Sequence, residues 1–118
     1  RKTKVLHSFY TLKDGSAIAF FEDPSTTFKF KKQRDFDLHI AFEVTLKDLN
    51  YFFDKGKKLG IETRGISDHG FIKSIYLRDP NGYIIELTTP TKGKTSQSKK
   101  NLVKILEKWD KIKPAQVY

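Results

Sequence analysis

One stretch of the sequence decides the fold, and it reads Asp68-His69-Gly70-Phe71-Ile72-Lys73-Ser74-Ile75-Tyr76-Leu77-Arg78-Asp79-Pro80-Asn81-Gly82-Tyr83-Ile84-Ile85-Glu86-Leu87. Residues 71 to 77 have the aromatic and β-branched composition of a strand, and residues 83 to 89 have it again. Between these runs, residues 79 to 82 have the Pro and Gly content of a tight turn. The stretch therefore predicts a β-hairpin.

Side-chain alternation places the polar groups of this hairpin. Successive side chains of a strand point to opposite faces of the sheet. Glu86 lies between Ile85 and Leu87, so if those two residues pack on a helix, Glu86 points to the opposite face. His69 and Tyr76 belong to the same hairpin. The pattern thus brings a histidine, a tyrosine and a glutamate onto one short unit.

Hydrophobic periodicity predicts the elements around the hairpin. Strands are expected over Val5–Leu12, Ala17–Glu22, Asp37–Val44 and Ile61–Gly65, and a helix is expected over 46–59. A second helical stripe ends at Pro114 and consists of Leu102, Ile105, Leu106, Trp109 and Ile112. The apolar positions of the sheet and the first helix predict one core, made of Ile40, Phe42, Val44, Leu49, Phe52, Phe53, Ile85 and Leu87.

Length and composition limit what the chain can be. Its 118 residues suit one small domain. The absence of cysteine excludes disulfides and thiolate metal sites. No apolar run is long enough to span a membrane and no signal peptide is visible, so we expect a cytoplasmic location and no membrane partner. The sequence starts with Arg1 rather than Met, and we expect further chain upstream of it.

The net charge of +9 is unevenly distributed. Residues 91–118 hold eight lysines against Glu107 and Asp110, which accounts for +6 of the +9. A nucleic-acid-binding domain concentrates its basic residues on one face, often with aromatic residues among them. Because the excess lies mainly in this tail, we expect a solvated surface and no nucleic-acid partner.

Two segments carry a resemblance to a known family. They are Leu38-His39-Ile40-Ala41-Phe42-Glu43-Val44 and the Asp79-Pro80-Asn81-Gly82 turn with Ile85-Glu86-Leu87 after it. Both resemble the vicinal-oxygen-chelate superfamily, which includes glyoxalase I, bleomycin-resistance proteins and extradiol dioxygenases. The hairpin also resembles the extradiol dioxygenase signature through His69, Ile75-Tyr76, the turn and Glu86, although Ser67 departs from its start.

This resemblance implies an α+β fold, in which βαβββ modules form a curved mixed sheet. Residues 1–118 would form a single domain whose first module is incomplete. Its parts would be the remainder of that first module (1–24), a linker (25–36), the second module (37–90), and a basic linker with a C-terminal helix (91–118).

The resemblance also implies a metal site. In such modules the first strand supplies a histidine ligand and the last strand a glutamate, which here are His39 and Glu86; strand alternation independently puts both on the face away from the helix. His69 and Tyr76 would handle substrate protons. Two histidines and one carboxylate suit non-haem Fe(II), with Mn, Zn and Ni as alternatives. The other histidine is expected upstream of Arg1.

Three functions stay open at this point. The first is a dioxygenase-like enzyme acting on a small substrate, catechols included. The second is a metal-free binding module of the bleomycin-resistance type. The third is a glyoxalase-like lyase or isomerase, although Ala19 occupies the place in the first module where glyoxalase I has a second carboxylate. Modules of this superfamily commonly pair within or between chains, so a homodimer is also open.

Overall fold

The computed structural model describes residues 4–92 and 99–114. The chain divides into two units between Lys32 and Gln33. In the first unit, β1 (Leu6–Thr11) pairs antiparallel with β2 (Ala17–Glu22). The Oδ1 atom of Asp14 accepts hydrogen bonds from the Ser16 amide at 2.9 Å and the Ser16 hydroxyl at 2.6 Å. Gly15 adopts a φ of 87°, which a glycine tolerates, so the Asp-Gly pair closes this hairpin.

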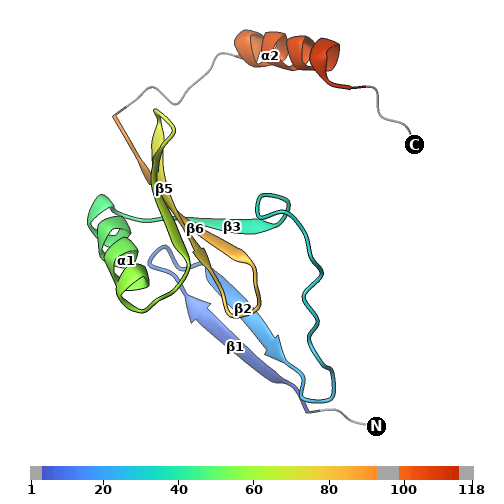
Figure 1. Cartoon of the computed structure of the whole chain (residues 1–118), viewed down its shortest axis with the longest axis vertical. Coiled ribbons are helices and arrows are strands. Elements are labelled where there is room, and N and C mark those ends of the chain that lie inside the picture. The colour runs from blue at the N-terminus through green and yellow to red at the C-terminus, as the bar shows by residue number, and fades with distance from the viewer. Residues whose placement is uncertain (1–3, 93–98, 115–118) are drawn as a thin grey trace. The chain divides into compact units, whose positions relative to one another are not determined.

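The second unit is built on a four-stranded mixed sheet (Figure 1). Its elements are β3 (His39–Glu43), α1 (Leu46–Lys58), β4 (Thr63–Asp68), β5 (Ile72–Arg78), β6 (Ile84–Pro90) and α2 (Lys99–Ile112). The strand order is β3-β6-β5-β4, with β3 parallel to β6 and the other pairs antiparallel. The predicted α+β class and the strand–helix–strand–strand–strand order are confirmed.

Helix α1 covers one face of this sheet. The Thr45 hydroxyl accepts a hydrogen bond from the Asp48 amide at 3.1 Å, which caps the first turn. The helix packs on β4, β5 and β6. A Cβ added at Gly56 would lie 3.1 Å from Leu77 Cδ2 and still closer to Thr63 Oγ1, so glycine permits this close approach. Thr63 and Leu77 therefore mark the helix-covered face, and we call the opposite side the open face.

The apolar core is smaller than the sequence predicts. The buried apolar side chains are Leu49, Ile75 and Ile84. Ile40 is 46% exposed and Phe52 is 38% exposed, so the prediction is wrong for these two residues. Among the described residues α1 contacts β4, β5 and β6 but not β3, which leaves Ile40 on an uncovered edge strand.

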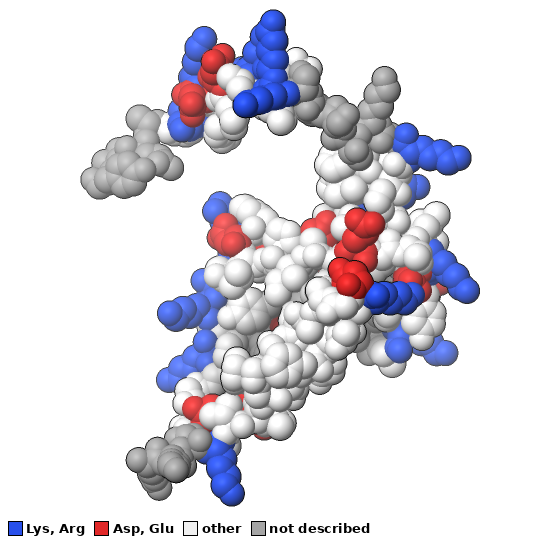
Figure 2. All heavy atoms as spheres, turned by 180° about the vertical axis from the view of Figure 1, so that it is seen from behind, with Lys and Arg blue, Asp and Glu red and all other residues white. Residues whose placement is uncertain are grey.

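Charged side chains are spread over the surface. On the face drawn in Figure 2, lysine and arginine stand in separate groups with acidic residues among them. Within the part of the chain that the structure describes, neither helix is long and apolar enough to cross a membrane.

The fold makes Leu49 the residue of α1 on which packing depends most, because its side chain is fully buried. We expect Leu49→Ala to lower the free energy of unfolding by about 2–4 kcal/mol through lost burial and the cavity it leaves. Leu46→Ala on the same helix, at a side chain that is 53% exposed, is the matched control and should cost less than about 1 kcal/mol. Urea denaturation followed by circular dichroism measures both, and equal losses would contradict this packing.

Candidate functional site

A row of polar side chains crosses the open face. Arg64 of β4 is paired with Tyr76 of β5, and Tyr76 is paired with Glu86 of β6. Directly paired residues of neighbouring strands point to the same face. Thr63 and Leu77 lie on the helix-covered face, so their neighbours Arg64 and Tyr76 lie on the open one.

His39 approaches this row from the edge strand. Parallel pairing sets Ala41 beside Glu86 and His39 beside Ile84. The Nε2 atom of His39 lies 3.2 Å from Oε2 of Glu86. The His39 side chain is 32% exposed and that of Glu86 only 10%, so the carboxylate is buried and the imidazole is partly open. Both side chains lie on the open face, as strand alternation predicts.

The donor set of this pair fits a divalent metal. Zinc–nitrogen and zinc–oxygen bonds of roughly 2.1 Å at the tetrahedral angle put the two donor atoms about 3.4 Å apart. The observed separation of 3.2 Å is close to that value. Among residues 4–92 and 99–114, no group of three or more His, Cys, Asp or Glu side chains could hold a metal. The third ligand that the family resemblance predicts upstream of Arg1 lies outside the described residues, and the ligand roles of His39 and Glu86 stay predictions.

His69 and Tyr76 are in direct contact. His69 lies in the turn between β4 and β5, where its amide donates to the Ile72 carbonyl at 2.9 Å. Its Nε2 atom lies 3.1 Å from the Tyr76 hydroxyl. Burial raises the pKa of Tyr76 above its usual value, and the negative charge of Glu86 adds to this effect. Tyr76 therefore remains a phenol at neutral pH and can donate a proton or a hydrogen bond.

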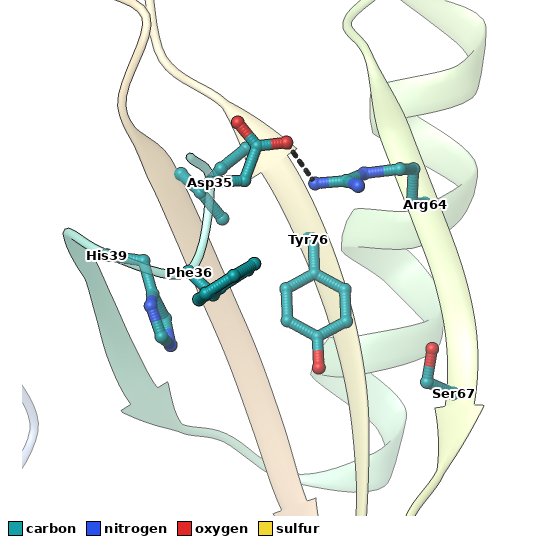
Figure 3. Close-up of a pocket in the computed structure, with 7 residues that line it drawn as sticks. Asp35, Phe36, His39, Arg64, Ser67 and Tyr76 are labelled. Carbon is teal, nitrogen blue, oxygen red and sulfur yellow. Dashed lines mark hydrogen bonds and ion pairs between the residues drawn. The ribbon is translucent and has the colours of Figure 1, made fainter. Parts of the chain in front are cut away.

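A cavity of about 350 Å³ lies on the open face. Figure 3 shows its walls, which are formed by Asp35, Phe36, His39, Arg64, Ser67, Tyr76 and Ile84. Of the predicted site residues, His39 and Tyr76 line this cavity, Glu86 contacts His39, and His69 contacts Tyr76. The structure thus brings all four together.

The sequence did not point to Asp35 or Arg64 as site residues. The Nη2 atom of Arg64 lies 2.9 Å from Oδ2 of Asp35, as the dashed line in Figure 3 marks. Asp35 falls in the predicted linker over 25–36. Arg64 falls in a strand predicted over 61–65, whereas β4 runs from Thr63 to Asp68. Only the register of β4 against β5 identifies Arg64 as a neighbour of Tyr76, and a single strand's pattern does not contain that register.

A β-bulge keeps Ser67 on the same face as Arg64. The pairing of β4 with β5 shifts between Gly65 and Ser67. Gly65 adopts a φ of 124°, and a Cβ at this position would lie 2.8 Å from the Ser74 carbonyl oxygen. Glycine is required here for both reasons. Regular alternation would put residues 64 and 67 on opposite faces of the sheet. Because of the bulge, Ser67 is paired with Ser74 and faces the cavity, as Arg64 does.

Comparison with known proteins gives both sequence and structural relatives. No family model matches the chain. It is 30% identical over 95 residues to the metallothiol transferase FosB of Shouchella clausii (strain KSM-K16), an alignment that covers 65% of this chain and 60% of that protein. The chain thus spans less than two thirds of the length of this curated relative.

Three solved structures share the fold. A glyoxylase/bleomycin resistance protein/dioxygenase domain from Frankia sp. EAN1pec has a TM-score of 0.64 at 18% identity, over 80% of this chain and 71% of that one. The integron cassette protein HFX_CASS4, from the mobile metagenome of the Halifax Harbour sewage outfall, has a TM-score of 0.52 at 19% identity, over 69% and 66%. The fosfomycin resistance protein FosX of Listeria monocytogenes, in its tetragonal form, has a TM-score of 0.50 at 22% identity, over 82% and 71%.

The fold and the sequence relative agree with the resemblance found in the sequence. The chain has the fold of a glyoxylase/bleomycin resistance protein/dioxygenase domain, and its sequence resembles the vicinal-oxygen-chelate superfamily.

Proposed function

We propose that this protein is a metal-dependent enzyme that acts on a small molecule as a transferase or lyase, with His39 and Glu86 as two ligands of a divalent ion. The observation that carries the proposal is the 3.2 Å separation of His39 Nε2 and Glu86 Oε2 on the open face. The name of the curated relative, a metallothiol transferase, favours thiol transfer over ring cleavage. The cavity of about 350 Å³ beside His39 has the size of a small-molecule site.

A divalent ion at this pair would supply Lewis-acid chemistry, which is the polarisation of a substrate oxygen. An imidazole and a carboxylate suit Mn, Fe, Zn and Ni alike, so the ligand set does not single out the Fe(II) favoured by the sequence. Two protein ligands hold a metal weakly, so the proposal requires a further ligand from another part of the protein or from a second copy.

The protein groups nearest to this pair would handle protons. Tyr76 is protonated at neutral pH because burial and Glu86 raise its pKa. With His69 3.1 Å from its hydroxyl, Tyr76 can donate a proton to a substrate and be reprotonated from the imidazole. His69 is exposed, so it can exchange that proton with water.

Ring cleavage by a dioxygenase is the second candidate. The contact between His69 and Tyr76 favours it, because the extradiol signature combines these two residue types in this hairpin. Oxygen uptake with a catechol and Fe(II) would support this candidate. Loss of thiol in the presence of small electrophiles and Mn, Zn or Ni would support the transferase.

The metal site makes a direct prediction for the full-length protein. Glu86→Gln and His39→Ala should each reduce the metal retained after dialysis by at least about tenfold, because each removes one of few ligands. Asp54→Asn, at an exposed carboxylate on α1, is the control and should retain the wild-type amount. Elemental analysis of the dialysed proteins gives the result. If the wild type retained no metal and had no metal-dependent activity, the enzyme proposal would fail. The metal-free binding module would then be the remaining function.

The proton-handling pair makes a second prediction. His69→Ala and Tyr76→Phe should each lower kcat by about a hundredfold or more, which is the usual contribution of a general acid–base group. For His69→Ala the metal content should stay within about twofold of wild type, since His69 contacts Tyr76 and not a proposed ligand. Tyr76→Phe removes a hydroxyl beside Glu86, so some metal loss is expected, but less than for Glu86→Gln. Parallel measurement of turnover and bound metal checks this. A loss of metal as large as the loss of turnover would make the residue a ligand or a folding residue.

A further inference from the structure

Helix α2 carries two opposite sides of different chemistry. At about 100° of rotation per residue, its apolar side chains concentrate in one arc of about 120°. This arc holds Leu102, Ile105, Leu106, Trp109 and Ile112, whereas Val103 lies outside it. The side opposite to the arc holds Lys100, Lys104, Lys108 and Lys111. The helix is therefore amphipathic, with an apolar side and a lysine side.

The apolar arc is accessible in the part of the chain that the structure describes. No residue of α2 is buried there, and the helix has no packing contact with the sheet or with α1. Trp109 is 53% exposed and Leu106 is 62% exposed. Covering apolar side chains of this size is favourable, so the arc is suited to an interaction surface.

The helix as a whole is basic. Within Lys99–Ile112, five lysines stand against Glu107 and Asp110, which gives a formal charge of +3. Asp110 is also paired with a lysine just beyond the helix, since its Oδ1 atom lies 2.7 Å from Nζ of Lys113. A partner that meets the lysine side should therefore carry negative charge.

We infer that α2 binds the surface of an anionic lipid bilayer, with its apolar arc toward the acyl chains and its lysines toward the headgroups. Helices with a lysine-rich polar side and Trp or Leu on the other side lie in the plane of the membrane interface in this way. Trp109 is near the middle of the arc, and indole rings concentrate at that interface. The sequence-based expectation of no membrane partner rests on the lack of a spanning segment, which a helix lying on the surface does not need.

Other occupants would use only one side of α2. Nucleic acid would engage the lysines and leave the apolar arc in water. The sheet of this chain, or a second copy of α2, would cover the arc and give the lysines no counter-charge. An anionic bilayer engages both sides, because it offers acyl chains and negatively charged headgroups at one surface.

Sedimentation with lipid vesicles tests the charge requirement on the full-length protein. Wild type should bind vesicles of phosphatidylcholine and phosphatidylglycerol in equal parts at least about tenfold more tightly than vesicles of phosphatidylcholine alone. The double variant Lys104→Gln/Lys108→Gln should weaken binding to the anionic vesicles by about tenfold or more. Lys47→Gln/Lys58→Gln removes the same charge from exposed positions on α1 and should change binding by less than about twofold.

A second pair of variants tests the apolar arc. Leu106→Ser should weaken vesicle binding by about tenfold, whereas Val103→Ser, outside the arc at a side chain that is 46% exposed, should change it by less than about threefold. Trp109 is the only tryptophan in these 118 residues. Its fluorescence should shift to shorter wavelength when anionic vesicles are added, and Trp109→Phe should remove this shift.

The outcomes separate a bilayer from the other occupants. Absence of vesicle binding by wild type would overturn the inference, as would equal binding with and without phosphatidylglycerol. If Leu106→Ser lowers the melting temperature or changes the oligomeric state as well as failing to affect vesicle binding, α2 packs on protein and the inference is wrong. Circular dichroism of each variant shows whether the helix is retained.

Discussion

The parallel pairing of β3 with β6 is the constraint on which the rest of the structure depends. Parallel neighbours cannot be joined by a tight turn, so the chain leaves β3 through α1 and reaches β6 only after β4 and β5. Because α1 lies over β4, β5 and β6, the opposite face remains open for a site. The same pairing sets Ala41 beside Glu86 and brings His39, far away in the sequence, within 3.2 Å of that carboxylate.

The turn between β5 and β6 fixes the second half of the site. Asp79 Oδ1 accepts hydrogen bonds from the Asn81 amide at 2.9 Å and the Tyr83 amide at 2.8 Å, and Gly82 adopts a φ of 96°. These features set the hairpin register that places Tyr76 opposite Glu86. A slip of one residue would move one of these two side chains to the covered face. The Asp-Pro-Asn-Gly sequence is therefore structural, and it acts on the site through register.

Features that depend on a single strand or helix could be predicted from the sequence. Features that depend on how these elements pair or pack could not. Alternation along single strands placed His39 and Glu86 on one face, and hydrophobic periodicity placed a helix over 46–59, where α1 runs from Leu46 to Lys58. Exposure of Ile40 depends on which strands α1 covers, which alternation does not encode. Arg64 was missed because only the register of β4 against β5 makes it a neighbour of Tyr76.

The charges around the site bear on the metal proposal. Asp35 and Glu62 accept hydrogen bonds from the guanidinium of Arg78, and Glu86 lies 3.2 Å from the imidazole of His39. The side chain of Glu86 is 10% exposed, so it is the carboxylate of these three that water screens least. A divalent ion held by His39 and Glu86 would place positive charge next to that carboxylate, and burial makes such a contact stronger than it would be on an exposed surface.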